Sequence, residues 1–371
     1  MIATKLHSLL LILILSSSLF CCSPKESVKI GFLGGVSGRV ADLGIAGRNG
    51  ALLAVEMRNR TGGINGRTIE LLVEDDQQDA EQAKAAVQRL IDHKVEAIVG
   101  PMTSMVAMAT VPLVNQARIV MMSPTVSTQD LSHIDDYFFR VISSTAEYAH
   151  KSADYQAMQQ GIRRVAAAYD LRNASYSESW LKEYHKALAA HGGEVILSEP
   201  YYSGDDTNFA TLTEKLLNVN PDAVLVIANS LDAAMLAQQV RKRDPYVHIA
   251  TSEWAATERL SELGGNAVEG VMIAQFMDRD SNNPSFLAFR QAYIDRFSME
   301  PGFGGVTAFD ATNVVLTALA AKEKSQTLKQ AILSQGLFIG VQSEIRFDKM
   351  GDAKRDTYMT TIHNGQFLRV R

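Results

Sequence analysis

The chain has 371 residues, 46% of them hydrophobic and 21% charged, which is the composition of a folded globular protein. This length is too great for one ordinary core and favours two domains. The formal net charge of −5 comes without long runs of Lys or Arg, so the sequence gives no basic surface for nucleic acid or for a membrane.

The first 21 residues have the features of an export signal. Lys5 precedes an apolar run at residues 9–15, and Cys21 and Cys22 follow. The run is shorter than the roughly 20 residues that a membrane-spanning helix needs. The letters LFCC resemble a bacterial lipoprotein box with Leu19 three residues before Cys22, which implies lipidation of Cys22 rather than Cys21. A plain secretory signal with incidental cysteines is the alternative.

Residues 28–40 begin as a strand-like apolar run and end in a cluster of glycines. Gly31, Gly34, Gly35 and Gly38 do not have the spacing of the dinucleotide-binding fingerprint, and no Lys-Ser/Thr pair completes a P-loop. The glycines therefore predict a tight turn between a strand and a helix.

Apolar runs and amphipathic segments alternate through residues 28–124, which predicts a parallel sheet covered by helices on both faces. We expect a helix over residues 44–60 and another that begins after Asp79 as its N-cap. Asp75, Asp76 and Asp79 also suggest a metal cluster, but acidic residues at a helix start are more often caps and dipole partners.

The same alternation restarts near residue 164 and indicates a second α/β unit. The pattern predicts helices over residues 178–191, 208–218, 232–243, 284–297 and 306–322. Asn364 and Gly365 lie between two alternating runs, which predicts a β-hairpin.

Six motifs, in order, carry a resemblance to a known family: GGVSGRVADLG, GGINGRTIELLVEDD, EAIVGPMTS, VMMSPTVSTQDLS, YDLRNASYSES and ATSEW. From about residue 28 onward the chain resembles the type I periplasmic binding proteins, in the leucine/isoleucine/valine-binding branch of the ABC-transporter receptors. The resemblance implies an α/β fold of two doubly wound parallel-sheet lobes, joined by three crossover segments, with the ligand in the cleft between them.

The resemblance also implies how the chain divides. Lobe one is expected from residues 28–143 plus 278–345, and lobe two from residues 144–277 plus 346–371. The crossovers are expected near residues 143–145, 276–278 and 345–347.

Polar residues for an amino-acid zwitterion lie in loops after strands, where ligands bind in such sheets. A buried charge is costly without a partner, so the site needs donors for the carboxylate and acceptors for the ammonium. Ser104 opens a helix and can face an anion with the free backbone N–H groups, or can be a simple N-cap. The resemblance implies that Ser104 binds the ligand carboxylate, that the Ser127 hydroxyl contacts both the carboxylate and the ammonium, and that the backbone carbonyl of Thr125 accepts from the ammonium. It also places Glu253 where the family has the carboxylate that binds the α-ammonium. A polar turn at Ser127 and a helix cap at Glu253 are the alternatives.

The remaining candidates form the walls of the expected cleft. Tyr176 matches an aromatic residue that closes the cleft from lobe two, and Asn229 replaces a tyrosine of the family. Apolar candidates for the side-chain pocket are Leu43, Met102, Trp254 and Phe276, each of which also suits a core position. If they line the pocket, an aliphatic or aromatic side chain is favoured over a charged one. Arg39 stands where the family has proline and receives no role from the sequence.

Together these features predict an extracytoplasmic solute-binding lipoprotein that closes on an amino acid and delivers it to ABC-transporter permease subunits. We expect a monomer on the periplasmic or cell-surface side of a bacterial membrane, without metal, cofactor or nucleic-acid partner. No Ser-His-Asp set or metal-ligand spacing points to an enzyme. The alternatives are a receptor for a separate signalling partner, or a binding protein for an amide or a small aromatic acid.

Overall fold

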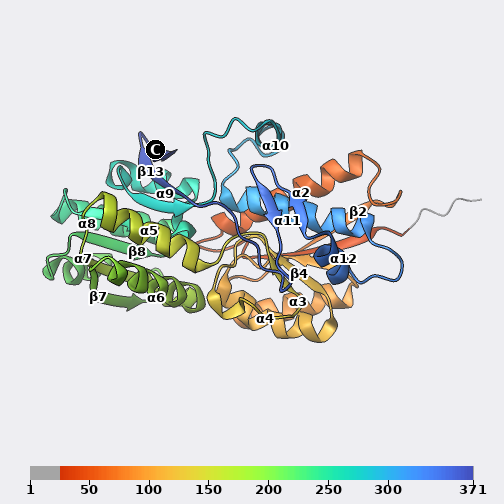
Figure 1. Ribbon diagram of the computed structural model, residues 1–371, viewed down its shortest axis with the longest axis horizontal. Coiled ribbons are helices and arrows are strands. Elements are labelled where there is room, and N and C mark those ends of the chain that lie inside the picture. Colours follow the sequence, from red (N-terminus) through yellow and green to blue (C-terminus); the bar gives the residue numbers. More distant parts are fainter. Residues whose placement is uncertain (1–25, 371) are drawn as a thin grey trace, which may run out of the picture.

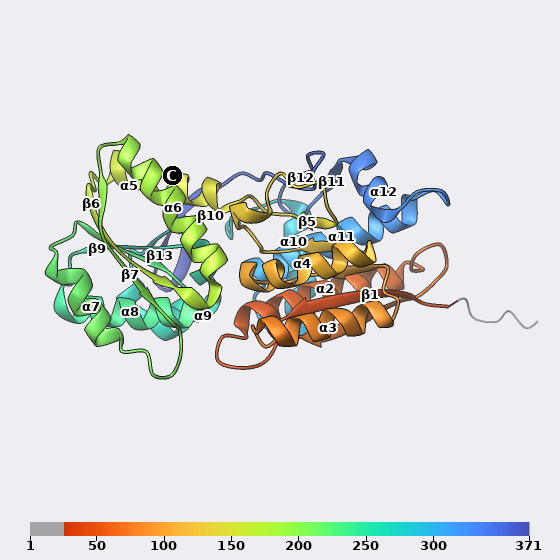
Figure 2. The same cartoon turned by 90° about the horizontal axis from the view of Figure 1, so that it is seen from below.

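A computed structural model describes residues 26–370, and the expected leader with Cys22 lies outside these described residues. Figures 1 and 2 show two lobes side by side, each built on a sheet with helices on both faces. The α/β fold with two parallel-sheet lobes that the sequence predicted is confirmed.

The first lobe contains an all-parallel sheet of strands in the order β2-β1-β3-β4-β5. These strands are β1 (Val28–Gly34), β2 (Ile69–Asp75), β3 (Ala97–Val99), β4 (Val120–Ser123) and β5 (Phe138–Arg140). Helices α2 (Asp42–Arg60) and α11 (Phe303–Ala321) pack together on one side of the sheet, and α3 (Ala80–Asp92) and α4 (Ser104–Ala117) on the other (Figure 1). Helices α10 (Pro284–Phe297) and α12 (Leu328–Gln335) and the hairpin of β11 (Leu337–Ile339) and β12 (Glu344–Arg346) complete the lobe.

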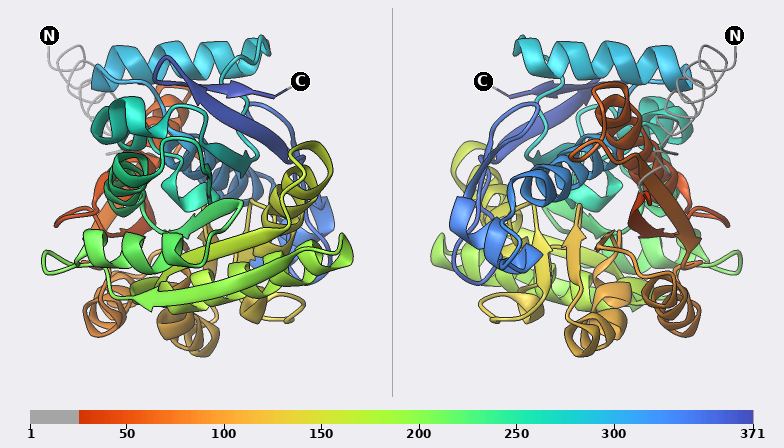
Figure 3. Two further views of the ribbon diagram at one scale, coloured as in Figure 1. Left: turned by 90° about the vertical axis from the view of Figure 1, so that its left-hand side faces the viewer. Right: turned by 90° about the vertical axis from the view of Figure 1, so that its right-hand side faces the viewer.

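The second lobe contains a sheet in the order β14-β13-β10-β9-β8-β6-β7. Its strands are β6 (Arg164–Asp170), β7 (Glu194–Tyr201), β8 (Ala223–Ile227), β9 (His248–Thr251), β10 (Met272–Gln275), β13 (Tyr358–His363) and β14 (Gln366–Arg369). Strands β6 to β10 are parallel, whereas β13 and β14 are antiparallel additions, visible in dark blue beside the C-terminus in Figure 3. Helices α5 (Thr145–Gln159) and α6 (Ala174–Ala190) lie opposite α7 (Phe209–Asn218), α8 (Ser230–Arg243) and α9 (Glu258–Gly264) (Figure 2).

Burial explains why the central strands are uniformly apolar. Every residue of β8 is buried, as expected for a strand covered by helices on both faces. Among the described residues, one helix, α11, is long and apolar enough to cross a membrane, but 83% of its most apolar stretch is buried inside the protein. It packs on α2 and strands of the first sheet, so it is a core helix.

The connections between the lobes follow β5, β10 and β12. β5 ends at Arg140, and α5 of the second lobe begins at Thr145. The third connection lies later than the predicted residues 345–347. Phe347 still packs edge-on against Phe139 at 5.8 Å, and Arg140 pairs with Asp352 at 2.7 Å, so the chain stays on the first lobe until after residue 352.

Local signals explain most helix and hairpin boundaries. The Asp79 carboxylate accepts hydrogen bonds from the backbone N–H groups of Glu81 and Gln82, each at 2.9 Å, so the predicted N-cap is confirmed. Helix α10 spans its predicted residues, whereas α6 begins at Ala174 instead of residue 178, directly after a short 3-10 turn. Asn364 and Gly365 adopt φ values of 50° and 72° between paired strands, which confirms the predicted hairpin.

Candidate functional site

A narrow cavity lies between the lobes, where loops that follow the parallel strands of both sheets meet. Ligands bind at this edge of open α/β sheets. The first lobe lines the cavity with Leu43, Met102, Thr103, Ser104, Thr125, Ile142 and Phe303. The second lobe lines it with Tyr148, Asn173, Tyr176, Glu253, Trp254, Gln275 and Phe276. Eight of the ten residues predicted from the sequence to bind ligand are thus placed around one space.

The start of helix α4 presents hydrogen-bond donors to this cavity. Thr103 is the N-cap residue in extended conformation, and Ser104 is the first helical residue, so the alternative of Ser104 as the cap is wrong. The Thr103 side chain makes no capping bond, and its buried hydroxyl has no partner within the described structure. The Ser104 hydroxyl accepts only a long bond of 3.4 Å from the Thr128 N–H. This helix start has the free donors and the dipole that attract an anion.

The glycines near the N-terminus make room for the side chain of Met102. A Cβ atom at Gly34 would lie 2.9 Å from Met102 Cγ, and one at Gly47 would lie 2.6 Å from Met102 Cε. Both distances are shorter than real contacts, so glycine at these positions lets Met102 pack close to β1 and α2. Leu43, one turn before Gly47 on α2, lines the cavity beside Met102.

Thr125 and Ser127 follow β4 and take different places. Thr125 lines the cavity and donates its hydroxyl to the backbone oxygen of Met102 at 2.7 Å. Ser127 is fully buried behind the lining, and its hydroxyl lies 3.4 Å from Glu253 Oε1 across the interlobe boundary. Ser127 therefore contacts the carboxylate that lines the cavity.

Glu253 lies at the start of a 3-10 turn that follows β9, and only 7% of its surface is exposed. Its carboxylate accepts a hydrogen bond of 2.9 Å from Trp180 Nε1, on α6, in addition to the weak contact with Ser127. Burial raises the pKa of Glu253 to about 7, with these hydrogen bonds acting in the opposite direction. Within residues 26–370, no Lys or Arg forms an ion pair with this carboxylate. The buried acid therefore has neutral donors but no counter-ion.

Tyr176 and Trp254 form the aromatic wall of the second lobe. Their rings pack edge to face at 5.5 Å with an interplanar angle of 77°. Burial, followed by the nearby Glu253 carboxylate, raises the pKa of Tyr176 well above its ordinary value, so its hydroxyl stays protonated. That hydroxyl lies close to Glu253 and Ser252 but makes no well-formed hydrogen bond in the described structure.

Asn229 does not line the cavity. It is the N-cap of α8, where its side chain accepts from the Asp232 N–H at 3.0 Å and donates to the Ser203 hydroxyl at 3.3 Å. The structure thus places Asn229 in a separate polar cluster with Ser203, which follows β7 and also accepts a hydrogen bond from Arg39.

Sequence reasoning missed six lining residues: Thr103, Ile142, Tyr148, Asn173, Gln275 and Phe303. A signal existed for Asn173 and Thr103, since each is a polar residue just before a helix that follows a strand. The Asn173 side chain accepts a 2.9 Å bond from the Met105 N–H and so crosses between the lobes. No local signal marks Phe303, at the start of α11, or Tyr148, in the first turn of α5.

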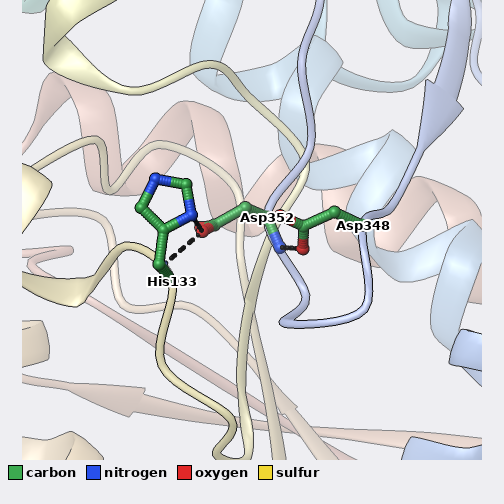
Figure 4. A group of neighbouring side chains, drawn as sticks. All are labelled: His133, Asp348 and Asp352. Atoms are coloured by element: carbon green, nitrogen blue, oxygen red, sulfur yellow. Dashed lines mark hydrogen bonds and ion pairs between the residues drawn. The ribbon is translucent and has the colours of Figure 1, made fainter.

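One group in the described part of the chain, His133, Asp348 and Asp352, has ligand atoms close enough for a metal (Figure 4). Its carboxylates already have partners. Asp348 accepts from the backbone N–H groups of Met350 and Asp352, and Asp352 pairs with Arg140 and accepts from the His133 N–H. These contacts show that the three side chains stabilise a turn.

Comparisons with known proteins give the family of the chain. Residues 27–366 match the family model described as periplasmic binding protein. A curated relative from Pseudomonas aeruginosa, the leucine-, isoleucine-, valine-, threonine-, and alanine-binding protein, is 24% identical over 331 residues, which cover 89% of this chain and 88% of the relative.

Solved structures share the fold. The branched-chain amino acid transporter substrate-binding protein LivJ from Streptococcus pneumoniae, in complex with isoleucine, has a TM-score of 0.85 and 24% identity, and the match covers 93% of this chain and 99% of LivJ. A solute-binding protein from R. palustris in complex with benzoate has a TM-score of 0.83 and 19% identity, and the match covers 93% of this chain and 95% of that protein.

Proposed function

The chain belongs to the periplasmic binding protein family, and from this premise we propose that it captures an α-amino acid with an apolar side chain outside the cytoplasm. In this proposal the two lobes close on the amino acid and present it to the permease subunits of an ABC transporter. The observation that carries the proposal is Glu253, a buried carboxylate without a counter-ion at the edge of the interlobe cavity.

The ammonium group of the ligand is the missing partner of Glu253. An ionised carboxylate taken out of water is costly unless a cation or several donors satisfy it. Trp180 and Ser127 supply neutral donors, and burial still raises the pKa of Glu253 to about 7. An α-ammonium in the cavity would complete this set with a charge-assisted hydrogen bond.

The carboxylate of the ligand fits the start of α4. The Thr103 hydroxyl lacks a partner in the described structure, the Ser104 hydroxyl has only a long contact, and the helix dipole favours negative charge there. Tyr176 adds a protonated hydroxyl from the opposite lobe. The cavity thus offers donors from both lobes, which is what closure on a ligand requires.

Most of the remaining lining is apolar, from Leu43, Met102, Ile142, Trp254, Phe276 and Phe303. The polar residues among the rest, Thr125, Tyr148, Asn173 and Gln275, carry no charge, so the cavity offers no charged partner to the ligand's side chain. Arg355, the cation behind Phe276 at 4.8 Å, already pairs with Asp310 at 2.9 Å. We therefore propose an aliphatic or aromatic side chain in preference to a charged one.

The proposed cellular setting rests on the family and on the expected leader. Periplasmic binding proteins act outside the cytoplasm, and we propose export through residues 1–21 and anchoring through a lipid on Cys22. We further propose that the protein acts as a monomer whose lobes rotate about the three connections.

A thermal-shift screen tests the function. Each of L-leucine, L-isoleucine, L-valine and L-phenylalanine is compared with the corresponding acid that lacks the amino group, because a ligand of the folded state raises the melting temperature by mass action. We expect one or more amino acids to raise it and their des-amino partners to leave it unchanged. A rise with benzoate or the des-amino acids alone would contradict the amino-acid proposal, and a tight ligand with no effect on transport in a permease-containing membrane would favour a sensor.

A further inference from the structure

Arg39 joins the two lobes at a place separate from the ligand cavity. It lies in the loop between β1 and α2 of the first lobe, and its guanidinium donates to Asp232 Oδ1 at 2.8 Å and to the Ser203 hydroxyl at 2.9 Å in the second lobe. A weaker contact of 3.4 Å reaches Asp205, whose side chain is 95% exposed and adds little. The side chain of Asp232, in contrast, is fully buried.

Asp42, the first residue of α2 directly after this loop, and Arg259 of the second lobe add further contacts between the lobes. The Asp42 carboxylate accepts hydrogen bonds from the hydroxyls of Ser230 at 2.7 Å and Thr257 at 2.6 Å, both in the second lobe. Arg259, also in the second lobe, donates to the backbone oxygen of Arg39 at 3.0 Å. We call this set of polar contacts between the lobes the Arg39 junction. It joins Arg39 and Asp42 of the first lobe to Ser203, Ser230, Asp232, Thr257 and Arg259 of the second.

The Arg39 junction occupies a natural binding position of the second sheet. β6 and β8 are neighbours in this sheet although β7 separates them in sequence, and the crevice at such a change of strand order is where α/β sheets bind ligands. Asp170 ends β6, Ser203 follows β7, and Asn229 follows β8. Here the crevice receives a side chain of the protein's own first lobe.

The crevice without Arg39 would be strongly acidic. Asp170 and Asp232 are both buried there, and burial raises the pKa of Asp170 to about 6, with the Asp232 charge acting in the same direction. The Tyr201 hydroxyl donates to Asp232 Oδ2 at 3.1 Å, and Arg39 is the cation that pairs with this carboxylate. Separation of the lobes would therefore remove the counter-ion of Asp232, whereas the ligand cavity contributes nothing to this pair.

We propose that the Arg39–Asp232 pair is an interlobe latch that stabilises the closed arrangement without touching the ligand. The affinity of a protein for its ligand scales with the fraction of molecules in the binding-competent state. The latch therefore raises affinity by increasing the closed fraction and by slowing the release of ligand. Its effect on affinity rests on the proposed function, but its effect on closure of the ligand-free protein does not.

Small-angle X-ray scattering of the ligand-free protein tests the latch directly. Arg39→Gln removes the charge of a side chain that is 26% exposed, and we expect a larger radius of gyration than for the wild type. Asp42→Asn, which weakens the same junction without touching Asp232, is expected to change the radius in the same direction. The matched control is Arg296→Gln, which breaks an ion pair of 3.0 Å with Glu56 inside the first lobe and should leave the radius unchanged.

Dissociation kinetics add a second measurement with whichever amino acid raises the melting temperature. We expect Arg39→Gln to increase the dissociation rate roughly 5- to 150-fold, the range of ordinary coupling between distant sites, with no change for Arg296→Gln. Equal scattering curves for Arg39→Gln and the wild type would overturn the latch. So would an unchanged dissociation rate. If no amino acid binds, the proposed function fails. The scattering of the ligand-free protein would still show whether Arg39 stabilises the closed arrangement.

Discussion

Two buried carboxylates of the second lobe, Glu253 and Asp232, lie in similar places and have opposite surroundings. Each belongs to the segment that follows a parallel strand, and each faces the first lobe. Asp232 forms an ion pair with the guanidinium of Arg39 at 2.8 Å. Glu253 accepts hydrogen bonds from the Trp180 N–H and the Ser127 hydroxyl and forms no ion pair with a Lys or Arg of the described residues.

We propose that this difference separates a structural carboxylate, Asp232, from one that binds ligand, Glu253. A buried charge that the protein itself neutralises contributes to holding parts of the protein together, as Asp310 also does with Arg355 at the connections between the lobes. A buried charge that the protein leaves without a counter-ion is costly in the free protein and becomes satisfied only when something else supplies the cation. Strongly shifted groups of this kind cluster at functional sites.

The largest expected effect is a loss of stability when a buried carboxylate is deprived of its counter-ion and so resembles Glu253. Arg355→Met removes the cation from Asp310, whose side chain is only 2% exposed, and should lower the free energy of unfolding by about 3 to 5 kcal/mol. Urea denaturation measures this loss. Arg346→Met, which breaks an exposed pair with Glu344 in β12, is the control, and equal stability losses in the two variants would remove the distinction between buried and exposed partners.

Removal of the Glu253 carboxylate should weaken the binding of an α-amino acid by about 2 to 5 kcal/mol, because the ammonium group would then be buried without its acceptor. Isothermal titration calorimetry of Glu253→Ala measures the change. Glu262→Gln, at an exposed acid on α9, should bind like the wild type. Full affinity in Glu253→Ala would end the assignment of the ammonium site.

The ligand-free protein should lose stability as the pH rises from about 4.5 to about 7. In this window the unfolded chain releases the Glu253 proton, whereas the folded protein, with the pKa of Glu253 raised to about 7, retains it. Unfolding therefore releases a proton, and higher pH favours unfolding by roughly 3 kcal/mol over the window.

Glu253→Gln isolates this contribution. Asp76 and Asp170, whose pKa values burial raises to about 6, add a slope of the same sign, but they are present in both proteins and cancel in the difference. The variant should be more stable than the ligand-free wild type at pH 8 and show a flatter profile in thermal unfolding. Parallel profiles would show that Glu253 is satisfied without a ligand.

A smaller effect is expected from the neutral donor of Glu253. Trp180→Phe keeps a buried ring but removes the Nε1–H bond to the carboxylate, and a hydrogen bond to a charged group contributes about 1.5 to 3 kcal/mol. We expect weaker ligand binding by calorimetry because the ionised form of Glu253 loses support. Tyr184→Phe, whose hydroxyl bonds to Gln156 and not to Glu253, provides the comparison. A larger loss in Tyr184→Phe would contradict the role of Trp180.

The sequence predicted the parts of the fold that depend on local signals. β1 and β6 are apolar runs with clear ends, the Asn-Gly pair fixes the C-terminal hairpin, and Asp79 caps α3. The loops after the strands also gave most of the cavity lining, because a parallel sheet brings these loops to one edge. The third connection was placed too early, since the pairing of Arg140 with Asp352 holds the chain on the first lobe.

What the sequence could not show depends on contacts between distant segments. The partners of Arg39 in the second lobe lie 164 and 193 positions further along the chain, so no spacing rule connects them. The orientation of Asn229 also depends on a contact with a distant segment and could not be predicted. Asn229 follows a strand as expected, but its side chain bonds to Ser203 in the Arg39 junction and does not line the cavity. Trp180, a helical aromatic residue, is indistinguishable in sequence from an ordinary core residue until its N–H meets Glu253.

The most direct test of the central claim is a calorimetric titration of the wild-type protein and Glu253→Gln with an amino acid that raises the melting temperature, and with the same acid lacking its amino group. The account predicts that the wild type binds the amino acid alone and that Glu253→Gln, which keeps the shape of the side chain but not its charge, binds it at least tenfold more weakly. Equal affinity of the wild type for both compounds, or of both proteins for the amino acid, would contradict the claim that Glu253 holds the ligand's ammonium group.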